Sequence, residues 1–317
     1  MTRREFVQQL AALAAVGRSR WKLNPSRKAA GRVFIATGLG GATTASLGQL
    51  TAALTEAVNR LTDSAEGWRR LFRPEEVVGL KVNCLSATLT THPVVVEAII
   101  EGLRQAGVRD ENIVIFDRRD AELAGHGGFS LNRGRRGVRC FGCKDAVRGG
   151  VPFEPRTVGS TTFAVSTLLT RECTALVNVP VLKDHSLAEV TLSLKNHFGS
   201  IRHPLHHHGP GQRCDPQVAQ LNSLPEIRLK TRLLVGDALT GMYEGGPFGP
   251  GCLWDAGLLL VATDPVALDT VGWRLINERR LAAHLPPHLL PAHVRTAAQR
   301  PYHLGCCRAG EVKTVKL

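Results

Sequence analysis

The stretch Ala175-Leu-Val-Asn-Val-Pro-Val-Leu-Lys-Asp-His185 carries the strongest structural signal in this chain of 317 residues. Its apolar part, 175–182, is typical of a strand that is buried on both faces, as strands in parallel α/β sheets are. The strand delivers Lys183, Asp184 and His185 at its carboxyl end. Ligands in open α/β sheets bind beyond the carboxyl ends of strands, so Lys183 and His185 are the first candidate site residues.

The residues after His185 predict a helix. Ser186 and Glu189 have the S-x-x-E spacing of a capping box, and apolar residues then recur at helical spacing as far as Gly199, a natural stop. The first turn of such a helix offers unpaired N–H groups and a positive dipole end. An anion is therefore expected to bind at the Lys-Asp-His turn.

Three polar residues on this predicted helix extend the candidate site. Thr191 and Lys195 are four residues apart and would share one helix face, and Asn196 follows directly. Lysines in a mostly apolar helix more often extend their ammonium groups to water, and that interpretation stays open. Together with the Lys-Asp-His turn, Lys195 and Asn196 are predicted to take part in catalysis and Thr191 to contact a cofactor.

The first half of the chain predicts alternating strands and helices. Strands are expected at 32–37, 77–82 and 112–117, and helices at 46–61 and 93–106. Such β-α-β units with short connections indicate an α/β fold, with a mostly parallel or mixed sheet flanked by helices. Residues 119–160 are rich in Gly and Arg without sustained periodicity, so an irregular insertion is expected there.

In the last third, another predicted strand leads to candidate site residues. The strand at 232–237 ends in Asp237, and the glycine-rich stretch after it contains Glu244, Gly245 and Gly246. Asp237 and Glu244 are candidates for holding a cation or transferring a proton, and the two glycines would let the backbone approach a ligand closely. A plain connector between two strands is the alternative interpretation of this glycine-rich stretch.

A further strand and a helix follow. Residues 258–262 predict the strand, and Asp264 with Pro265 forms an N-cap followed by proline at the first helical position. Asp269 then falls among apolar neighbours more than one turn into the helix. An isolated carboxylate there would be unfavourable, so Asp269 is expected to pair with a lysine of the site.

Two clusters contain residue types that bind metals. Cys140 and Cys143 form a single C-x-x-C pair, the spacing of a metal or redox site, with no second pair at matched spacing. His203 and His206 belong to a group of four histidines on a Gly- and Pro-rich stretch. A metal ion or an iron–sulfur cluster is the cofactor that these residues favour. Inert cysteines and solvated loop histidines are the alternative.

Charge and composition limit the partners. The chain carries a net charge of +13 and only 5% aromatic residues. The positive field favours an anionic small molecule or cofactor as partner. There are few aromatic side chains for base stacking and no helix-turn-helix or RNA-recognition motif, so no nucleic acid is expected. No apolar run reaches the roughly 18 residues that span a bilayer, which argues against an integral membrane protein.

Residues 1–30 form a separate N-terminal segment. Arg3 and Arg4 precede a short apolar stretch, a pattern that resembles a twin-arginine export leader. With such a leader, export machinery is a partner and the protein is periplasmic or extracytoplasmic. As an ordinary N-terminal helix, the segment leaves a cytoplasmic protein. The α/β domain is expected over 31–280 and a Pro- and His-rich extension over 281–317.

Several spaced motifs resemble the family called domain of unknown function 362 (DUF362). They are Val179-Pro-Val-Leu-Lys-Asp-His185, Val190-Thr-Leu-Ser-Leu-Lys-Asn-His-Phe-Gly199, Asp237 with Glu244-Gly-Gly-Pro247, and Asp264-Pro-Val-Ala-Leu-Asp269. The segments Lys81-Val-Asn83 and His92-Pro93 fit its amino-terminal half. The resemblance implies a bacterial or archaeal protein without a settled activity. Some members carry a twin-arginine leader or a ferredoxin-like iron–sulfur module, but this chain lacks the C-x-x-C-x-x-C array of that module.

Two functional hypotheses from different classes follow. The first is a redox-linked enzyme in which Lys183, Lys195 and Asn196 hold an anionic substrate or cofactor and His185 shuttles a proton. In this hypothesis the carboxylates of Asp237 and Asp269 position a lysine or a metal. The second is a non-catalytic protein that uses the same basic pocket to carry or sense an anion or a metal.

Overall fold

The structure is a computed structural model that describes residues 31–317 except 135, 145–151, 210 and 212. The predicted N-terminal leader lies outside the described residues. The described chain forms one ten-stranded sheet and a separate two-stranded sheet. The strands of the large sheet are β1 (Arg32–Ala36), β2 (Val78–Lys81), β3 (Ile113–Phe116), β4 (Arg139–Cys140), β7 (Ala175–Asn178), β8 (Val181–His185), β9 (Glu189–Thr191), β10 (Thr231–Glu244), β11 (Cys252–Ala262) and β12 (Lys313–Lys316).

The large sheet is mixed and mostly parallel, as the sequence predicts. Its main path runs β12-β1-β11-β10-β7-β2-β3-β4, and β8 and β9 are attached beside β10. The central run from β10 through β7 and β2 to β3 is parallel, whereas β10 pairs with β11 and β11 with β1 in antiparallel fashion. The carboxyl ends of β2, β3 and β7 therefore lie at one edge of the sheet.

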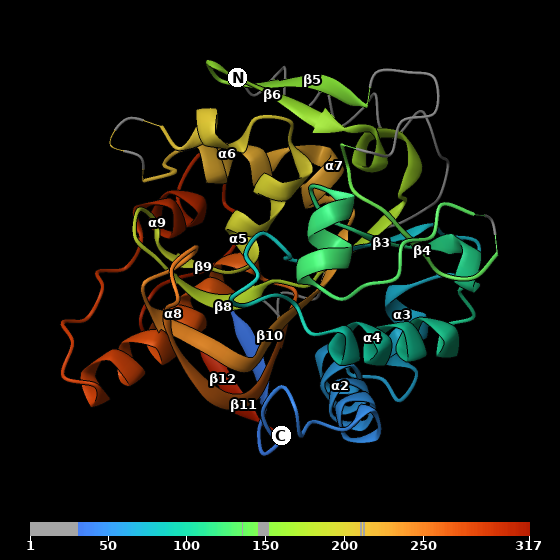
Figure 1. The fold of residues 1–317 in the computed structure, drawn as a ribbon, viewed down its shortest axis with the longest axis horizontal. Helices are drawn as coiled ribbons and strands as arrows, with labels where there is room; N and C mark the ends of the chain where they lie inside the picture. The colour runs from blue at the N-terminus through green and yellow to red at the C-terminus, as the bar shows by residue number, and fades with distance from the viewer. Residues whose placement is uncertain (1–30, 135, 145–151, 210, 212) are drawn as a thin grey trace.

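Helices cover both faces of the sheet (Figure 1). One face carries α2 (Leu47–Thr62), α3 (Gly67–Leu71) and α4 (Pro93–Gln105), which include the two helices predicted in this half of the chain. The other face carries α5 (Ser193–Asn196), α6 (Gln217–Ser223), α7 (Pro225–Arg228), α8 (Pro265–Ala282) and α9 (Ala292–Ala298). The protein is thus an α/β fold with helices on either side of its sheet.

Alternating side chains join each strand to two hydrophobic clusters. In β3, Ile113 and Ile115 pack with the α2–α4 side, while Val114 and Phe116 belong to the cluster on the other side. In β11, Leu259 and Val261 face the α2–α4 side, and Leu260 faces α8. Strands buried on both faces need apolar residues at every position, and this explains the continuous apolar runs in the sequence.

The segment after His185 differs from the prediction. The apolar run 175–182 is two strands, β7 and β8, separated at Val179 and Pro180. In place of a long helix, a tight turn leads into β9, which pairs antiparallel with β8 so that Lys183 faces Thr191. Glu189 takes a positive φ of 66°, which an N-terminal helical turn does not allow. Only residues 193–196 are α-helical in this stretch.

The physical reason is that residues 190–194 satisfy two periodicities at once. Val190, Leu192 and Leu194 alternate with polar residues, which is the pattern of a half-buried strand, while the wider spacing also fits a helix. The ring of His185 selects the strand pairing, because its Nδ1 accepts hydrogen bonds from the backbone N–H groups of Leu187 and Ala188 and closes the turn.

Three other segments of the chain also contain strands. The glycine-rich stretch begins as strand, because β10 continues to Glu244 before the chain turns. The end of the predicted insertion contains β5 (Phe153–Val158), which pairs with the following strand β6 (Thr161–Ser166) in the separate two-stranded sheet. In the C-terminal extension, β12 pairs in parallel with β1 at the edge of the large sheet.

Asp264 ties the start of α8 to both ends of the described chain. Its carboxylate accepts hydrogen bonds from the backbone N–H groups of Ala267 (2.8 Å), Cys306 (3.0 Å) and Gly31 (3.2 Å). The first of these is the predicted N-cap. The other two join β1 and the C-terminal segment to the same carboxylate, which is only 6% exposed.

We expect Asp264→Ala to lower the free energy of unfolding by about 2 kcal/mol or more, because a cap is lost and buried N–H groups remain unpaired. Urea denaturation followed by circular dichroism measures this change. Asp264→Asn is the matched control. It keeps one cap oxygen and should lose clearly less stability, so equal losses in the two variants would contradict this account.

Candidate functional site

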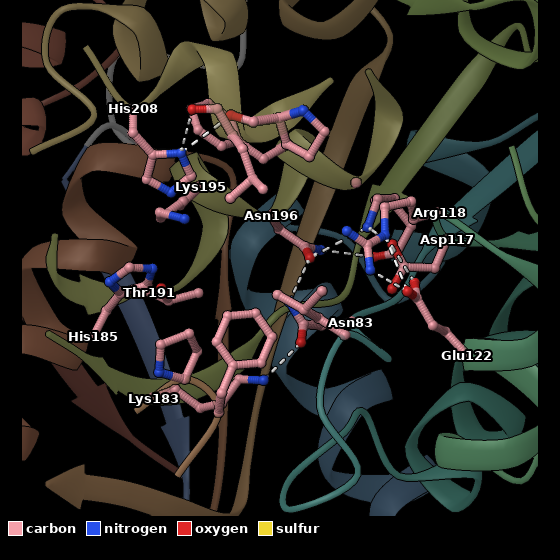
Figure 2. Close-up of a pocket in the computed structure, with 18 residues that line it drawn as sticks. Asn83, Asp117, Arg118, Glu122, Lys183, His185, Thr191, Lys195, Asn196 and His208 are labelled. Atoms are coloured by element: carbon pink, nitrogen blue, oxygen red, sulfur yellow. Dashed lines mark hydrogen bonds and ion pairs between the residues drawn. The ribbon is translucent and has the colours of Figure 1, made fainter. Parts of the chain in front are cut away.

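A cavity of about 80 Å³ lies where the ends of β2, β3 and β8 meet β9 and α5. Lys81 ends β2, Asp117 directly follows β3, and Lys183 and His185 come from the second half of β8. Thr191 from β9 and Lys195 from α5 complete its basic side (Figure 2). The volume is sufficient for several water molecules or for one compact anionic group.

Ion pairs occupy one side of the cavity. The buried ammonium group of Lys81 lies 2.6 Å from Asp117 Oδ1, and Asp117 Oδ2 accepts the backbone N–H of Cys84 at 2.6 Å. Beside them Arg118 Nε donates to Glu122 at 3.0 Å. Both carboxylates that line the cavity are therefore already paired with cations of the chain. Figure 2 shows the pair of Arg118 and Glu122.

Lys183 is a second buried lysine, only 1% exposed. Its ammonium group donates to Asn83 Oδ1 at 2.7 Å and to the carbonyl oxygen of Leu89 at 3.0 Å. Both acceptors are neutral, so they orient the charge without cancelling it. Burial lowers the pKa of Lys183 from 10.5 to about 8, because the charged form loses its water.

Lys195 is the third lysine of the cavity and is 8% exposed. Its Nζ lies 4.9 Å from the centre of the Phe198 ring, a favourable cation–π distance. Burial lowers the pKa of Lys195 as well. Among the described residues, no carboxylate is within ion-pair distance of Lys195 or Lys183.

The charges of the cavity do not balance. Four cationic side chains line it, and only two carboxylates do. When both lysines without carboxylate partners are protonated, two positive charges remain uncompensated. The hydroxyl group of Thr191 adds a donor, because its Oγ1 is buried and has no hydrogen-bond partner in the described part of the chain. Such a site is complementary to a small dianion.

Two histidines line the cavity, and one offers a hydrogen-bond donor to a ligand while the other offers an acceptor. His185 Nδ1 accepts backbone hydrogen bonds, so in the neutral ring the proton sits on Nε2, which can donate to a ligand. His208 Nδ1 contacts the carbonyl oxygens of Pro204 (3.1 Å) and Leu205 (3.3 Å) and must donate, which leaves Nε2 as an acceptor. Their ring centres are 6.3 Å apart.

Both imidazoles stay neutral near physiological pH. Burial, followed by the nearby Lys195, lowers the pKa of His185 to about 2. The same two causes lower the pKa of His208. The neutral His185 ring can therefore donate a hydrogen bond from Nε2, and the proton-shuttle role expected from the sequence stays a prediction.

Asn196 joins the two sides of the cavity. Its side-chain amide donates to the carbonyl oxygen of Lys81 (2.9 Å) and to Asn178 Oδ1 (2.7 Å). Its Oδ1 accepts from Asn83 Nδ2 at 3.2 Å and from the ammonium group of Lys81 at 3.4 Å. The predicted residue Asn196 thus acts as a positioning residue between β2, β7 and α5.

Asp269 supports the site from behind rather than lining it. Its carboxylate accepts from the backbone N–H groups of Ser193 (2.7 Å) and Leu194 (3.1 Å) and from the Ser193 hydroxyl group (2.6 Å). The expected lysine partner is therefore replaced by donors at the start of α5. The hydrogen bonds to Asp269 hold the short helix α5, which carries Lys195. Burial raises the pKa of Asp269 to about 7.

The residues predicted from the last third lie away from the cavity lining. Asp237 is fully buried and accepts from the backbone N–H groups of His92 (2.8 Å) and Leu239 (3.1 Å), and it also contacts the ring of His92. Glu244 pairs with Arg280. Gly246 donates its N–H to Asp184 at 3.0 Å, and Gly245 takes a positive φ of 79° that suits the turn after β10.

Among the described residues, the predicted metal ligands are not grouped into a metal site. Cys140 and Cys143 are 2% and 1% exposed, and burial raises the pKa of Cys140 to about 12. The rings of His203 and His206 stack on each other 5.2 Å apart, and neither lines the cavity. In the described residues no three His, Cys, Asp or Glu side chains are grouped to hold a metal ion. The metal ion or iron–sulfur cluster expected from the sequence stays a prediction.

Sequence reasoning missed several residues of the site. Lys81, Asn83, Asp117, Arg118, Glu122 and His208 all line the cavity. The rule that selected Lys183, a polar residue at the carboxyl end of a predicted parallel strand, applies equally to Lys81 and Asp117. His208 gave no such signal, because only the fold brings its loop over β8.

None of the described helices has both the length and the apolar character to span a bilayer.

Comparisons with known proteins place the chain in a family without an assigned reaction. Residues 78–274, more than half of the chain, match the sequence profile described as "Domain of unknown function (DUF362)". No curated protein matches the chain. Among solved structures, a protein from Thermotoga maritima is similar at 12% identity with a TM-score of 0.44. The match covers 76% of this chain and 60% of that one.

We expect Asp117→Asn to lower the free energy of unfolding by about 3–5 kcal/mol, because the buried charge of Lys81 then lacks its counter-charge. Urea denaturation measures the effect. Glu56→Gln, which removes the exposed helical ion pair with Arg60, serves as control and should change stability by about 0.5 kcal/mol at most. Similar losses in both variants would show that the Lys81–Asp117 pair has no special weight.

Proposed function

Since the chain belongs to the DUF362 family, whose description names no reaction, we propose a function from the pocket itself: the protein binds a small dianionic molecule there and transfers protons on it as an enzyme. Lys183, Lys195 and Thr191 hold the anionic group in this proposal, and His185 donates a further hydrogen bond. The observation that supports it most directly is the pair of buried lysines without a carboxylate partner in the described residues.

Charge complementarity favours a dianion over a neutral or cationic ligand. A buried ammonium group without a counter-charge destabilises the folded protein, and an anion that enters the cavity removes this penalty. Charge-assisted hydrogen bonds from two lysines would contribute about 1.5–3 kcal/mol each to binding. Phosphate esters and dicarboxylates are ligand classes that match this donor set.

Groups that can move a proton lie beside the proposed anion site. His208 Nε2 is a free acceptor at neutral pH, and a lysine with a lowered pKa can exchange its proton near the operating pH. His185 would polarise the ligand as a neutral donor, in the way that some isomerases use a neutral imidazole. These features favour acid–base chemistry on the bound anion.

A non-catalytic carrier is the second candidate function. The same two buried lysines support it, since they would hold an anion whether or not a reaction follows. Analysis of the ligand extracted from purified protein, after incubation with candidate phosphates and dicarboxylates, separates the two functions. A converted compound supports the enzyme, and an unchanged compound supports the carrier. The redox linkage expected from the sequence stays a prediction.

We expect Lys195→Met to weaken sulfate binding about tenfold or more while leaving the free energy of unfolding unchanged or higher, because it removes a buried charge. Isothermal calorimetry with sulfate and urea denaturation measure the two effects. Lys313→Met changes an exposed lysine of β12 and is the control, with no expected effect on binding. Equal sulfate affinity in Lys195→Met and the unmodified protein would rule out this anion site.

Sulfate affinity should fall as the pH rises above about 8. The pKa of Lys183 is lowered to about 8 in the free protein, so this residue loses its proton there, whereas an ordinary lysine keeps it up to 10.5. Only the protonated form attracts an anion, and sulfate remains a dianion over this range. Calorimetry at a series of pH values measures the decline, which should become smaller in Lys183→Met. Constant affinity from neutral pH to well above 8 would contradict the assignment.

A further inference from the structure

Two large apolar side chains stand exposed where the cavity opens. Leu205 is 74% exposed and Phe248 is 65% exposed, and both belong to the cavity lining. Leu289, at 74%, is the one other large apolar side chain in the described part of the chain that is as exposed. Single exposed apolar residues are common on protein surfaces, but here two of the three lie at one basic cavity.

Leu205 is held in place by the loop that carries it. It belongs to the 3₁₀ turn Pro204–His207, which starts with a proline of fixed φ. The carbonyl oxygen of Leu205 accepts the backbone N–H of His208 at 3.3 Å, and the His208 ring donates to Pro204 at 3.1 Å. The residue that offers Nε2 to a ligand therefore also fixes the position of Leu205.

Phe248 is held in place as well, on the turn between β10 and β11. Gly246 donates its N–H to Asp184 Oδ2 at 3.0 Å and accepts the N–H of Ser186 at 3.1 Å. On the other side of Phe248, the carbonyl oxygen of Gly249 accepts the hydroxyl group of Thr88 at 3.1 Å. The turn is tied to its neighbours before and after the exposed ring.

Leu205 and Phe248 come from segments more than forty residues apart and meet in the lining of the same cavity. The floor of this cavity carries the two lysines without carboxylate partners, so charge lies inside and apolar surface lies outside. A ligand that is anionic at one end and apolar at the other would satisfy both parts. Its apolar end would remove the two exposed side chains from water, which favours binding.

We propose that the ligand is an organic dianion whose anionic head carries an apolar group, aryl or branched alkyl, and that Leu205 and Phe248 are the specificity-determining residues that hold this group. The inference rests on the proposed anion site and deepens it. The site would then bind a hydrophobic phosphate ester, for example, more tightly than inorganic phosphate or the phosphate ester of a polyhydroxylated molecule.

The test compares phenyl phosphate, glycerol phosphate and inorganic phosphate by calorimetry at a pH where all three are dianions. We expect the unmodified protein to bind phenyl phosphate about tenfold more tightly than the other two, as burial of a few tens of Å² of apolar surface predicts. Leu205→Ala and Phe248→Ala should each remove most of this preference and leave the affinity for inorganic phosphate unchanged. Leu289→Ala is the matched control and should keep the preference.

The outcomes separate this inference from the function on which it rests. Equal affinity for all three compounds, with binding still lost in Lys195→Met, would overturn the apolar specificity and leave the anion site intact. Failure of every compound to bind would overturn both. A loss of preference in Leu289→Ala as large as in Phe248→Ala would also overturn the inference, because the effect would then be a general surface property. The three substituted side chains are exposed, so all variants are expected to fold, and circular dichroism verifies this.

Discussion

The amide of Asn196 is the contact on which the geometry of the pocket depends. It donates to the carbonyl oxygen of Lys81 and to Asn178, and its oxygen accepts from Asn83 and from the Lys81 ammonium group. One side chain thus uses both of its donors and both acceptor positions, and it connects β2, β7 and α5 in a buried setting where an unpaired polar atom is unfavourable. Because every hydrogen-bonding position of the amide is used, the short helix that carries Lys195 has one favoured position against the sheet.

The buried lysines around this contact differ in whether a carboxylate neutralises their charge. Lys81 has a carboxylate partner in Asp117, so it belongs to the permanent framework. Lys183 donates only to the neutral oxygens of Asn83 and Leu89, and the ammonium group of Lys195 lies over the ring of Phe198. The folded protein keeps two charges that are not cancelled by its own described residues, which is a state that stability alone would not favour. Ligand binding is the physical reason that we assign to it.

Strand ends could be predicted from the sequence because they follow from a local rule. A continuous apolar run followed by Lys183 and His185 indicates a buried parallel strand with its carboxyl end at the site, and the structure places both residues in the cavity lining. The segment after it could not be predicted in the same way. Val190, Leu192 and Leu194 fit a strand and a helix equally well, and the pairing of Lys183 with Thr191 across β8 and β9 decides between them. Asp269 shows the same limit: its burial was foreseeable, but its partners on Ser193 and Leu194 lie far along the chain.

The sequence by itself determined the α/β class, the order of most strands and helices, the capped start of α8 and the excess of positive charge. Those properties depend on periodicity, capping and composition, which act between near neighbours or on the chain as a whole. Only the tertiary structure decided which charges are cancelled and which remain open to a ligand. The partners of Lys81 and Lys183 lie 36 and 100 residues away, and hydrogen bonds of a few ångströms between such positions exist only once the sheet has brought the strand ends together.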